Sequence, residues 1–400
     1  MTPRRGALAL GAIALVAALA TGSRAIGVVG VGFLFAGALT WLWAWLVDAP
    51  VAVTQTITPS PAVEGDRVRV EIEAARTSRV PLGSMSLRVS GGRLGVRSCR
   101  LRSRGRVAMG SLDLGRLPRG VFSLSGTELA LGDLLGLVTV RPRVACDAQT
   151  IVVRPRLSAL DGLFSDAGRA AGDGRRILLR RSAGFDFHSV RQYEQGESLR
   201  RVHWPTSARR GQLMVKELED TAHDGVVVLL DCDPRCAVGE PASSSFDAAV
   251  RAAGSILQAH ATRGRMATLV STGRSRAVAP VRSAGDLDGA VGHLAAAEPD
   301  ALDGLGRFLA GDHAWLASGE LAIVTATTDP AAFAQVLAVA TRRLVSVVWV
   351  DAASHTGRPT RAEPGLLRLA AHGIPTAVVR EGDDLAVVLS APTLQAVARG

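Results

Sequence analysis

Two uncharged apolar stretches at the N-terminus are the first pattern in the chain. Residues 6–22 and 25–47 contain no Asp, Glu, Lys or Arg, and Arg24 lies between them. A helix needs about 20 apolar residues to cross the hydrocarbon core of a bilayer. The second stretch ends in tryptophans, whose rings favour the headgroup layer: Trp41, Trp43 and Trp45. We therefore expect a helical hairpin with two transmembrane helices in residues 1–48, the alternative being a buried hairpin in a soluble core.

Basic residues near these stretches set the expected orientation. Arg4 and Arg5 precede the first stretch, against the single Arg24 in the turn. Because cytoplasmic segments carry the excess of basic residues, the N-terminus is expected in the cytoplasm. Two spans return the chain to the side where it started. The sequence thus predicts a multi-pass protein of the cell membrane with a cytoplasmic body.

Alternation with period two dominates residues 49–156. In residues 67–74, Val68, Val70 and Ile72 alternate with charged residues, which is typical of a strand with one buried face. Further short alternating runs follow, separated by Gly, Pro and Asp. Several short strands at this spacing predict a small antiparallel β-sandwich.

Longer buried strands alternate with helical patterns in residues 222–400. Residues 225–233, GVVVLLDCD, form a continuous apolar run that ends in acids, and residues 246–264 have apolar positions at helical spacing. Residues 265–273, 321–329 and 344–352 are further apolar runs, and residues 275–283 are expected to pair at an edge. This alternation predicts an open, mostly parallel, Rossmann-like α/β sheet with helices on both faces.

Composition narrows the class of protein. The 400 residues are 48% hydrophobic and 20% charged, which excludes a disordered chain. The net charge is +10, but Lys216 is the only lysine, and such an arginine bias is typical of GC-rich coding. Binding to nucleic acid through an arginine-rich surface is therefore only an alternative. Four cysteines without zinc-type spacing exclude a disulfide scaffold and disfavour a structural zinc site.

The segment that connects the two folded regions, residues 157–221, has an unusual composition. Residues 175–217 contain the only Tyr of the chain, its only Lys, Trp204 and two of its eight His residues. The segment reads FHSVRQY from Phe187, GESLRRVHW from Gly196, SAR from Ser207 and MVKE from Met214. We take the following as its signature residues: His188, Ser189, Arg191, Tyr193, Gly196, Glu197, Arg200, Trp204, Ser207, Arg209 and Lys216.

This ordered set of motifs resembles the signature of the domain of unknown function 58 (DUF58) family. Where that family commonly has Asp, this chain has Glu197 after the motif glycine and His203 before the tryptophan. The resemblance implies a membrane protein whose C-terminal domain is von Willebrand factor A-like. It also implies a MoxR-type AAA+ ATPase as a partner, and in some cases a membrane transglutaminase-like protein.

The side chains of the signature allow three interpretations. Arginines and glutamates could form a network that clasps the two domains together, since guanidinium groups pair with carboxylates in a bidentate manner. Tyr193, Trp204 and the arginines could instead form a docking face, because these residue types dominate interface hot spots. In a catalytic interpretation, His188 or His203 would act as a general base.

The acids after the buried strands are candidates for an ion site. Asp231, Asp233 and Asp329 follow two predicted strands, at the sheet edge where ligands of such folds bind. Metal-binding von Willebrand A-like domains carry Asp-x-Ser-x-Ser here, and both serines are missing in this chain, which has Arg235 in the last position. Mg²⁺ is the one candidate ion for this site, and otherwise no cofactor is expected. Cys232 and Cys236 are expected to be buried thiols rather than a metal pair.

Together these features predict a membrane-anchored, non-enzymatic scaffold or adaptor, and the resemblance implies that it docks a MoxR-type AAA+ ATPase system through the signature and the A-like domain. The first alternative is a metal-dependent hydrolase that uses Asp231, Asp233 and His203. The second is a nucleic-acid-binding protein, although the arginine-rich strands lack aromatic residues for base stacking.

Overall fold

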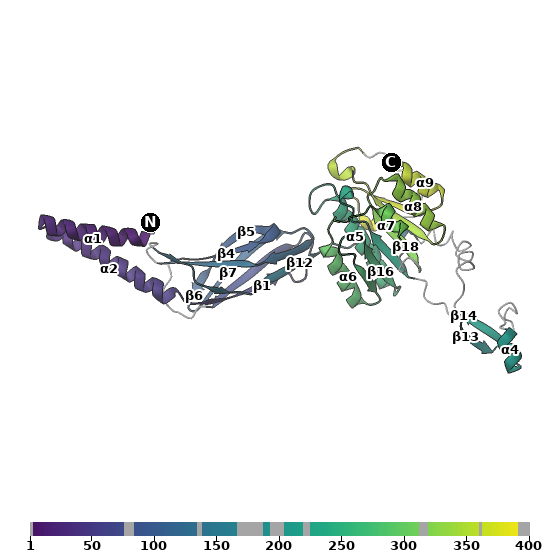
Figure 1. Cartoon of the computed structure of the whole chain (residues 1–400), viewed down its shortest axis with the longest axis horizontal. Helices are drawn as coiled ribbons and strands as arrows, with labels where there is room; N and C mark the ends of the chain where they lie inside the picture. Colours follow the sequence, from purple (N-terminus) through teal and green to yellow (C-terminus); the bar gives the residue numbers. More distant parts are fainter. Residues whose placement is uncertain are drawn as a thin grey trace. The chain divides into compact units, whose positions relative to one another are not determined.

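A computed structural model describes residues 3–75, 84–133, 138–165, 187–192, 204–218, 225–311, 319–359 and 362–390 (Figure 1). The chain divides into two compact units, Met1–Arg154 and Pro155–Gly400, which are described separately below.

Two helices open the first unit and pack against each other. α1 spans Pro3–Thr21 and α2 spans Arg24–Val47, with Ser23 capping α2 through the amide of Ile26. Glycines permit close approach, since a Cβ on Gly11 or Gly30 would lie 3.0 Å from a backbone nitrogen of the other helix. The two predicted spans thus correspond to α1 and α2. Among the described residues, only α2 is long and apolar enough to cross a membrane, because the apolar part of α1, Leu8–Thr21, is shorter.

Three sheets make up the rest of the first unit. The first has the strand order β11-β1-β3-β7-β6, the second β10-β9-β4-β5 and the third β2-β12-β8. Their strands are β1 (Val51–Thr58), β2 (Ala62–Val63), β3 (Arg67–Ala75), β4 (Ser84–Gly91), β5 (Gly95–Arg100), β6 (Arg102–Arg104), β7 (Val107–Arg116), β8 (Gly120–Leu124), β9 (Gly126–Gly132), β10 (Thr139–Val140), β11 (Val144–Ala145) and β12 (Gln149–Arg154).

One hydrophobic core joins these sheets. Along β3, every second residue is buried, and Val68, Val70 and Ile72 reach the core as the alternation predicts. Val47 at the end of α2 belongs to the same core, so the helix continues directly into the β domain. The predicted antiparallel pairing is found for most described strand pairs of this unit but is wrong at two, because the β1–β11 and β12–β2 pairs are parallel. Each of these pairings spans two residues, which is too short to produce a periodic pattern.

The signature segment contributes a separate two-stranded sheet. β13 (Phe187–Gln192) pairs antiparallel with β14 (Met214–Leu218), and α4 (Trp204–Arg210) lies between them in sequence.

A six-stranded sheet forms the centre of the second unit, in the order β17-β16-β15-β18-β19-β20. All neighbours are parallel except β16 and β17, which confirms the predicted edge pairing. The strands are β15 (Val226–Leu230), β16 (Ala267–Ser271), β17 (Val278–Val281), β18 (Glu320–Thr325), β19 (Val345–Val350) and β20 (Thr376–Val379). The helices are α5 (Ser245–Thr262), α6 (Ala284–Ala296), α7 (Leu305–Ala310), α8 (Pro330–Ala340), α9 (Pro364–Ala371) and α10 (Leu385–Ser390).

Helices cover both faces of this sheet. Val226, Val228 and Leu230 of β15 pack into a core with α5, α6 and α10. Val227 and Leu229 point into a second core with α7, α8 and α9. Burial on both faces explains why β15 is a continuous apolar run instead of an alternating one.

Candidate functional site

The topology of the six-stranded sheet brings the predicted acids to one edge. β15 lies at the centre of the sheet, with β16 on one side and β18 on the other. The strand order changes direction between β15 and β18, and in open α/β sheets ligands bind outside the carboxyl ends of the strands at such a switch point. Asp231 directly follows β15, and Thr325 is the last residue of β18. The site of interest is therefore the carboxyl edge at these two strands.

Asp231 is a buried structural acceptor at this edge. Its side chain accepts hydrogen bonds from the Thr325 hydroxyl, at 2.7 Å, and from the Asp233 amide, at 3.1 Å. Thr325 in turn accepts from the amide of Thr327, at 3.0 Å. Burial raises the pKa of the Asp231 carboxyl, and the hydrogen bond from Thr325 opposes this shift. Asp231 thus connects the carboxyl ends of β15 and β18 through the hydroxyl of the last residue of β18.

Asp233 forms an ion pair with Arg235. The Arg235 Nε lies 3.0 Å from each Asp233 carboxylate oxygen, and Nη2 lies 2.6 Å from Oδ2. Hydrogen bonds from Arg235 hold the pKa of Asp233 below its ordinary value and raise the pKa of Arg235. Gly304 makes room for the guanidinium, because a Cβ there would lie 2.7 Å from Nη2. Both oxygens of Asp233 are therefore already engaged by a cation of the protein itself.

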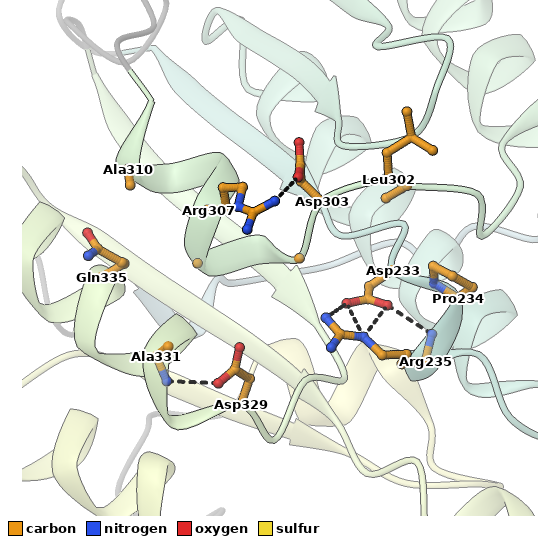
Figure 2. Close-up of a pocket in the computed structure, with 13 residues that line it drawn as sticks. Asp233, Pro234, Arg235, Leu302, Asp303, Arg307, Ala310, Asp329, Ala331 and Gln335 are labelled. Carbon is orange, nitrogen blue, oxygen red and sulfur yellow. Dashed lines mark hydrogen bonds and ion pairs between the residues drawn. The ribbon is translucent and has the colours of Figure 1, made fainter.

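An open pocket of about 600 Å³ lies in front of this pair (Figure 2). Arg235 enters it from one side, and Arg307, paired with Asp303 at 2.9 Å, enters from another. Asp329 borders the pocket and caps α8 by accepting from the amide of Ala331, at 2.9 Å. The pocket is thus lined by two exposed guanidinium groups and by carboxylates that already have partners.

The three candidate acids do not form a metal centre. Within the described ranges, no group of three or more His, Cys, Asp or Glu side chains is placed to hold a metal ion. Arg235 explains part of this result, because its guanidinium engages the carboxylate of Asp233. Cys232 and Cys236 are buried free thiols, and burial raises their pKa values to about 11 and about 12.

The signature residues are distributed over β13, α4 and β14. The backbones of His188, Ser189 and Arg191 lie in β13, and that of Lys216 lies in β14 opposite Val190. Tyr193, Gly196, Glu197, Arg200 and His203 lie outside the described residues, so their predicted roles stay predictions.

Helix α4 is fixed to β14 by Ser207. The buried Ser207 hydroxyl accepts from the amide of Met214, at 2.8 Å, and donates to its carbonyl, at 3.4 Å. On the same helix, Trp204 is 63% exposed and Arg209 is also exposed. The result is a large aromatic ring and a guanidinium presented to solvent on an anchored helix.

Sequence reasoning did not assign a role to the threonines at the end of β18 and directly after it. Thr325 and Thr327 hold Asp231 and the turn toward α8, and the indole of Trp349 donates to the Thr327 carbonyl at 2.9 Å. The sequence does contain a pattern that could have indicated them, because residues 325–329 read TATTD at the carboxyl end of a buried strand.

The fold and the carboxyl edge of the six-stranded sheet define the class of protein. It is an α/β domain with a doubly wound strand order, preceded by a β domain and an apolar helix. Residues 189–310 match the family model described as "Protein of unknown function DUF58". The family resemblance of the signature is thus confirmed over that range.

Comparison with individual proteins gives two further matches. The "Uncharacterized protein YeaD" of Bacillus subtilis (strain 168) is 28% identical over 200 residues, which are 50% of this chain and 48% of the relative. The chain therefore matches about half the length of that curated relative. A solved structure, Cwp6 from Clostridium difficile, aligns over 74% of this chain and 37% of its own, at 8% identity and a TM-score of 0.16, which is too low to carry an argument.

Proposed function

We propose that this protein is a membrane-anchored docking protein that binds a MoxR-type AAA+ ATPase through its signature segment and its α/β domain. A membrane transglutaminase-like protein is a second partner of the same kind. Both partner classes follow from the family resemblance. The chemistry of the residues supports the docking role itself.

The exposed Trp204 carries this proposal. Tryptophan buries a large area on binding and loses little conformational entropy, and it is enriched in interface hot spots together with arginine. Trp204 is 63% exposed, yet the helix that carries it is tied to β14 by two hydrogen bonds of the buried Ser207. A large aromatic ring exposed on an anchored helix, together with the exposed Arg209 of the same helix, supports a docking face.

The anchor consists of α2, with α1 as a second span that returns the chain to the cytoplasmic side. α2 has 24 residues and carries no charged residue after Arg24, with which it begins. The support for α1 is its packing on α2 through Gly11 and Gly30, since small residues at helix contacts are typical of association within a bilayer. A multi-pass anchor of this kind leaves the body in the cytoplasm, in agreement with Arg4 and Arg5 before the first span.

The α/β domain is proposed to be von Willebrand A-like and to act by binding protein. Its strand order, with a single antiparallel edge strand in the described sheet, supports the fold. Its carboxyl edge supports docking over metal-dependent hydrolysis, because Asp231 accepts from Thr325 and Asp233 is paired with Arg235. The second alternative, nucleic-acid binding through the arginine-rich β domain, has less support because the arginine-rich strands lack aromatic residues for base stacking.

Site-specific photocrosslinking in native membranes tests the docking role. A photoreactive amino acid replaces Trp204 in one variant and Leu367 in the other, since Leu367 is similarly exposed, at 54%, but lies on α9 outside the signature. The proposal predicts an adduct with a AAA+ ATPase from position 204, identified by mass spectrometry, and a much weaker one from position 367. Intramolecular products alone at position 204 would contradict docking and support the clasp.

A further inference from the structure

The end of the β domain that adjoins α2 can be identified from strand register. Only residues 48–50 separate the end of α2 at Val47 from the start of β1 at Val51. Across the first sheet, Ala52 pairs with Ala75, Ala75 with Val107, and Val107 with Arg104. These residues therefore form one row at the end of the sheet where the chain arrives from the helix. If α2 spans the membrane, this row faces the bilayer surface.

Exposed arginines lie at this row or within a few residues of it along the chain. The β6–β7 hairpin carries three of them, and another ends β5, separated from β6 by Leu101 alone. At the opposite edge of the sheet, the carbonyl of Arg143 accepts from the amide of Val51, at 3.0 Å. With strands about 4.8 Å apart, the five strands of this sheet span about 19 Å. The juxtamembrane arginines, as we call them, are Arg100, Arg102, Arg104, Arg106, Arg141 and Arg143, and all six are exposed.

These arginines have no carboxylate partners in the part of the chain that the structure describes, where no ion pair involves any of the six. The acids near the same end of the domain are Asp48, Glu73, Asp147 and the buried Asp133, so the six arginines leave positive charge in excess. Exposed, unpaired guanidinium groups beside a membrane anchor favour an anionic ligand that lies in the membrane plane. Met109, opposite Arg102 in the register and 58% exposed, adds an apolar contact for the interface.

We propose that the juxtamembrane arginines bind the phosphate headgroups of anionic phospholipids and hold the β domain against the bilayer surface. Each planar guanidinium can donate two parallel hydrogen bonds to phosphate oxygens. Basic groups next to a spanning helix are attracted to anionic lipids within about a Debye length of the surface. This inference rests on the proposed anchoring by α2 but is independent of the AAA+ partner.

Lipid titration of the full chain tests this inference. The protein, purified in a neutral detergent, is titrated with dioctanoyl phosphatidylglycerol, with dioctanoyl phosphatidylcholine and with inorganic phosphate. The test variant is Arg102→Gln/Arg104→Gln/Arg106→Gln, and Arg104→Gln alone serves as a milder second variant. A matched control, Arg342→Gln/Arg358→Gln/Arg368→Gln, removes the same charge from exposed positions of the α/β domain. Melting temperatures show whether each variant folds as the wild type does.

We expect phosphatidylglycerol to bind the wild type more tightly than either phosphatidylcholine or inorganic phosphate. Each arginine contributes about fivefold to affinity, so Arg104→Gln should weaken binding about fivefold and the triple variant about 100-fold. The matched control should bind as the wild type does. Equal loss in the control, unchanged binding in Arg104→Gln, or inorganic phosphate binding as tightly as the lipid would each overturn the proposal. Extraction of membranes with carbonate tests the anchor separately, so a failure of the anchor is distinguishable from a failure of lipid binding.

Discussion

Removal of the Thr325 hydroxyl tests whether Asp231 is a structural residue. Thr325→Val keeps the shape of the side chain but loses the 2.7 Å hydrogen bond to Asp231 and the acceptor for the Thr327 amide. A hydrogen bond to a charged group contributes about 1.5–3 kcal/mol and a neutral one about 0.5–1.5 kcal/mol. Because Asp231 is only 2% exposed, water cannot replace the lost donor. We expect a loss of about 2–4 kcal/mol in the stability of the α/β domain.

Hydrogen exchange measured by mass spectrometry can report this loss within the full chain. The amide of Asp231 donates to the Val324 carbonyl at 2.9 Å and therefore reports the pairing of β15 with β18. If this amide exchanges through opening of the domain, a loss of about 2–4 kcal/mol in stability makes its exchange about 30- to 1,000-fold faster. Thr325→Ser keeps the hydroxyl and should remain close to the wild type. Thr341→Val removes a hydroxyl that bonds only the exposed end of α8, and it serves as the control for the substitution itself.

A double-mutant cycle identifies the cause of the effect. In an Asp231→Asn background the buried charge is absent, so Thr325→Val should cost less than it does in the wild type. Exchange of the Asp231 amide at the same rate in Thr325→Val and Thr325→Ser would refute the reasoning. So would an equal cost of Thr325→Val with and without the Asp231 charge.

Three further predictions concern titration, thiol reactivity and topology. Because burial raises the folded-state pKa of Asp231 above its unfolded value, the stability of the wild type should decrease as pH rises from the ordinary aspartate pKa through the raised one. The Asp231→Asn variant should lack this decrease, and parallel pH profiles of wild-type and variant stability in chemical denaturation would contradict the prediction. Iodoacetamide at pH 8 should leave Cys232 and Cys236 unmodified in the folded protein, because both are buried and their pKa values are raised to about 11 and about 12; rapid labelling of either in peptide mapping would show that the edge opens. In intact cells, a membrane-impermeant thiol reagent should leave a cysteine introduced at Leu367 unlabelled until the cells are permeabilised, whereas labelling beforehand would reverse the proposed orientation.

Regular elements could be predicted because one residue pattern determines each of them. The alternation of Val68, Val70 and Ile72 predicts the buried face of β3, and the structure confirms it. The continuous apolar run in residues 225–233 likewise predicts a strand buried on both faces, as found for β15. In both cases the polarity of successive side chains in one short segment determines which of them are buried, so local periodicity is sufficient to predict the strand and its buried faces.

The contacts at the site could not be predicted in the same way. Asp231 and Thr325 are 94 residues apart and meet only because β15 and β18 are neighbours in the sheet. The sequence placed Arg235 beside the acids but did not show that its guanidinium engages both oxygens of Asp233. The two-residue parallel pairings of β11 and β2 were also missed, because such short strands are determined by tertiary contacts and not by local pattern.

The central claim is tested most directly by measuring how tightly the purified full chain binds the AAA+ ATPase that crosslinking identifies. The dissociation constant is measured for the wild type, for Trp204→Ala and for Leu367→Ala as the exposed control. If Trp204 is the centre of a docking face, Trp204→Ala should weaken binding by about 30-fold or more, which is about 2 kcal/mol, while Leu367→Ala should change it less than about threefold. Equal affinities of the wild type and Trp204→Ala would contradict the account.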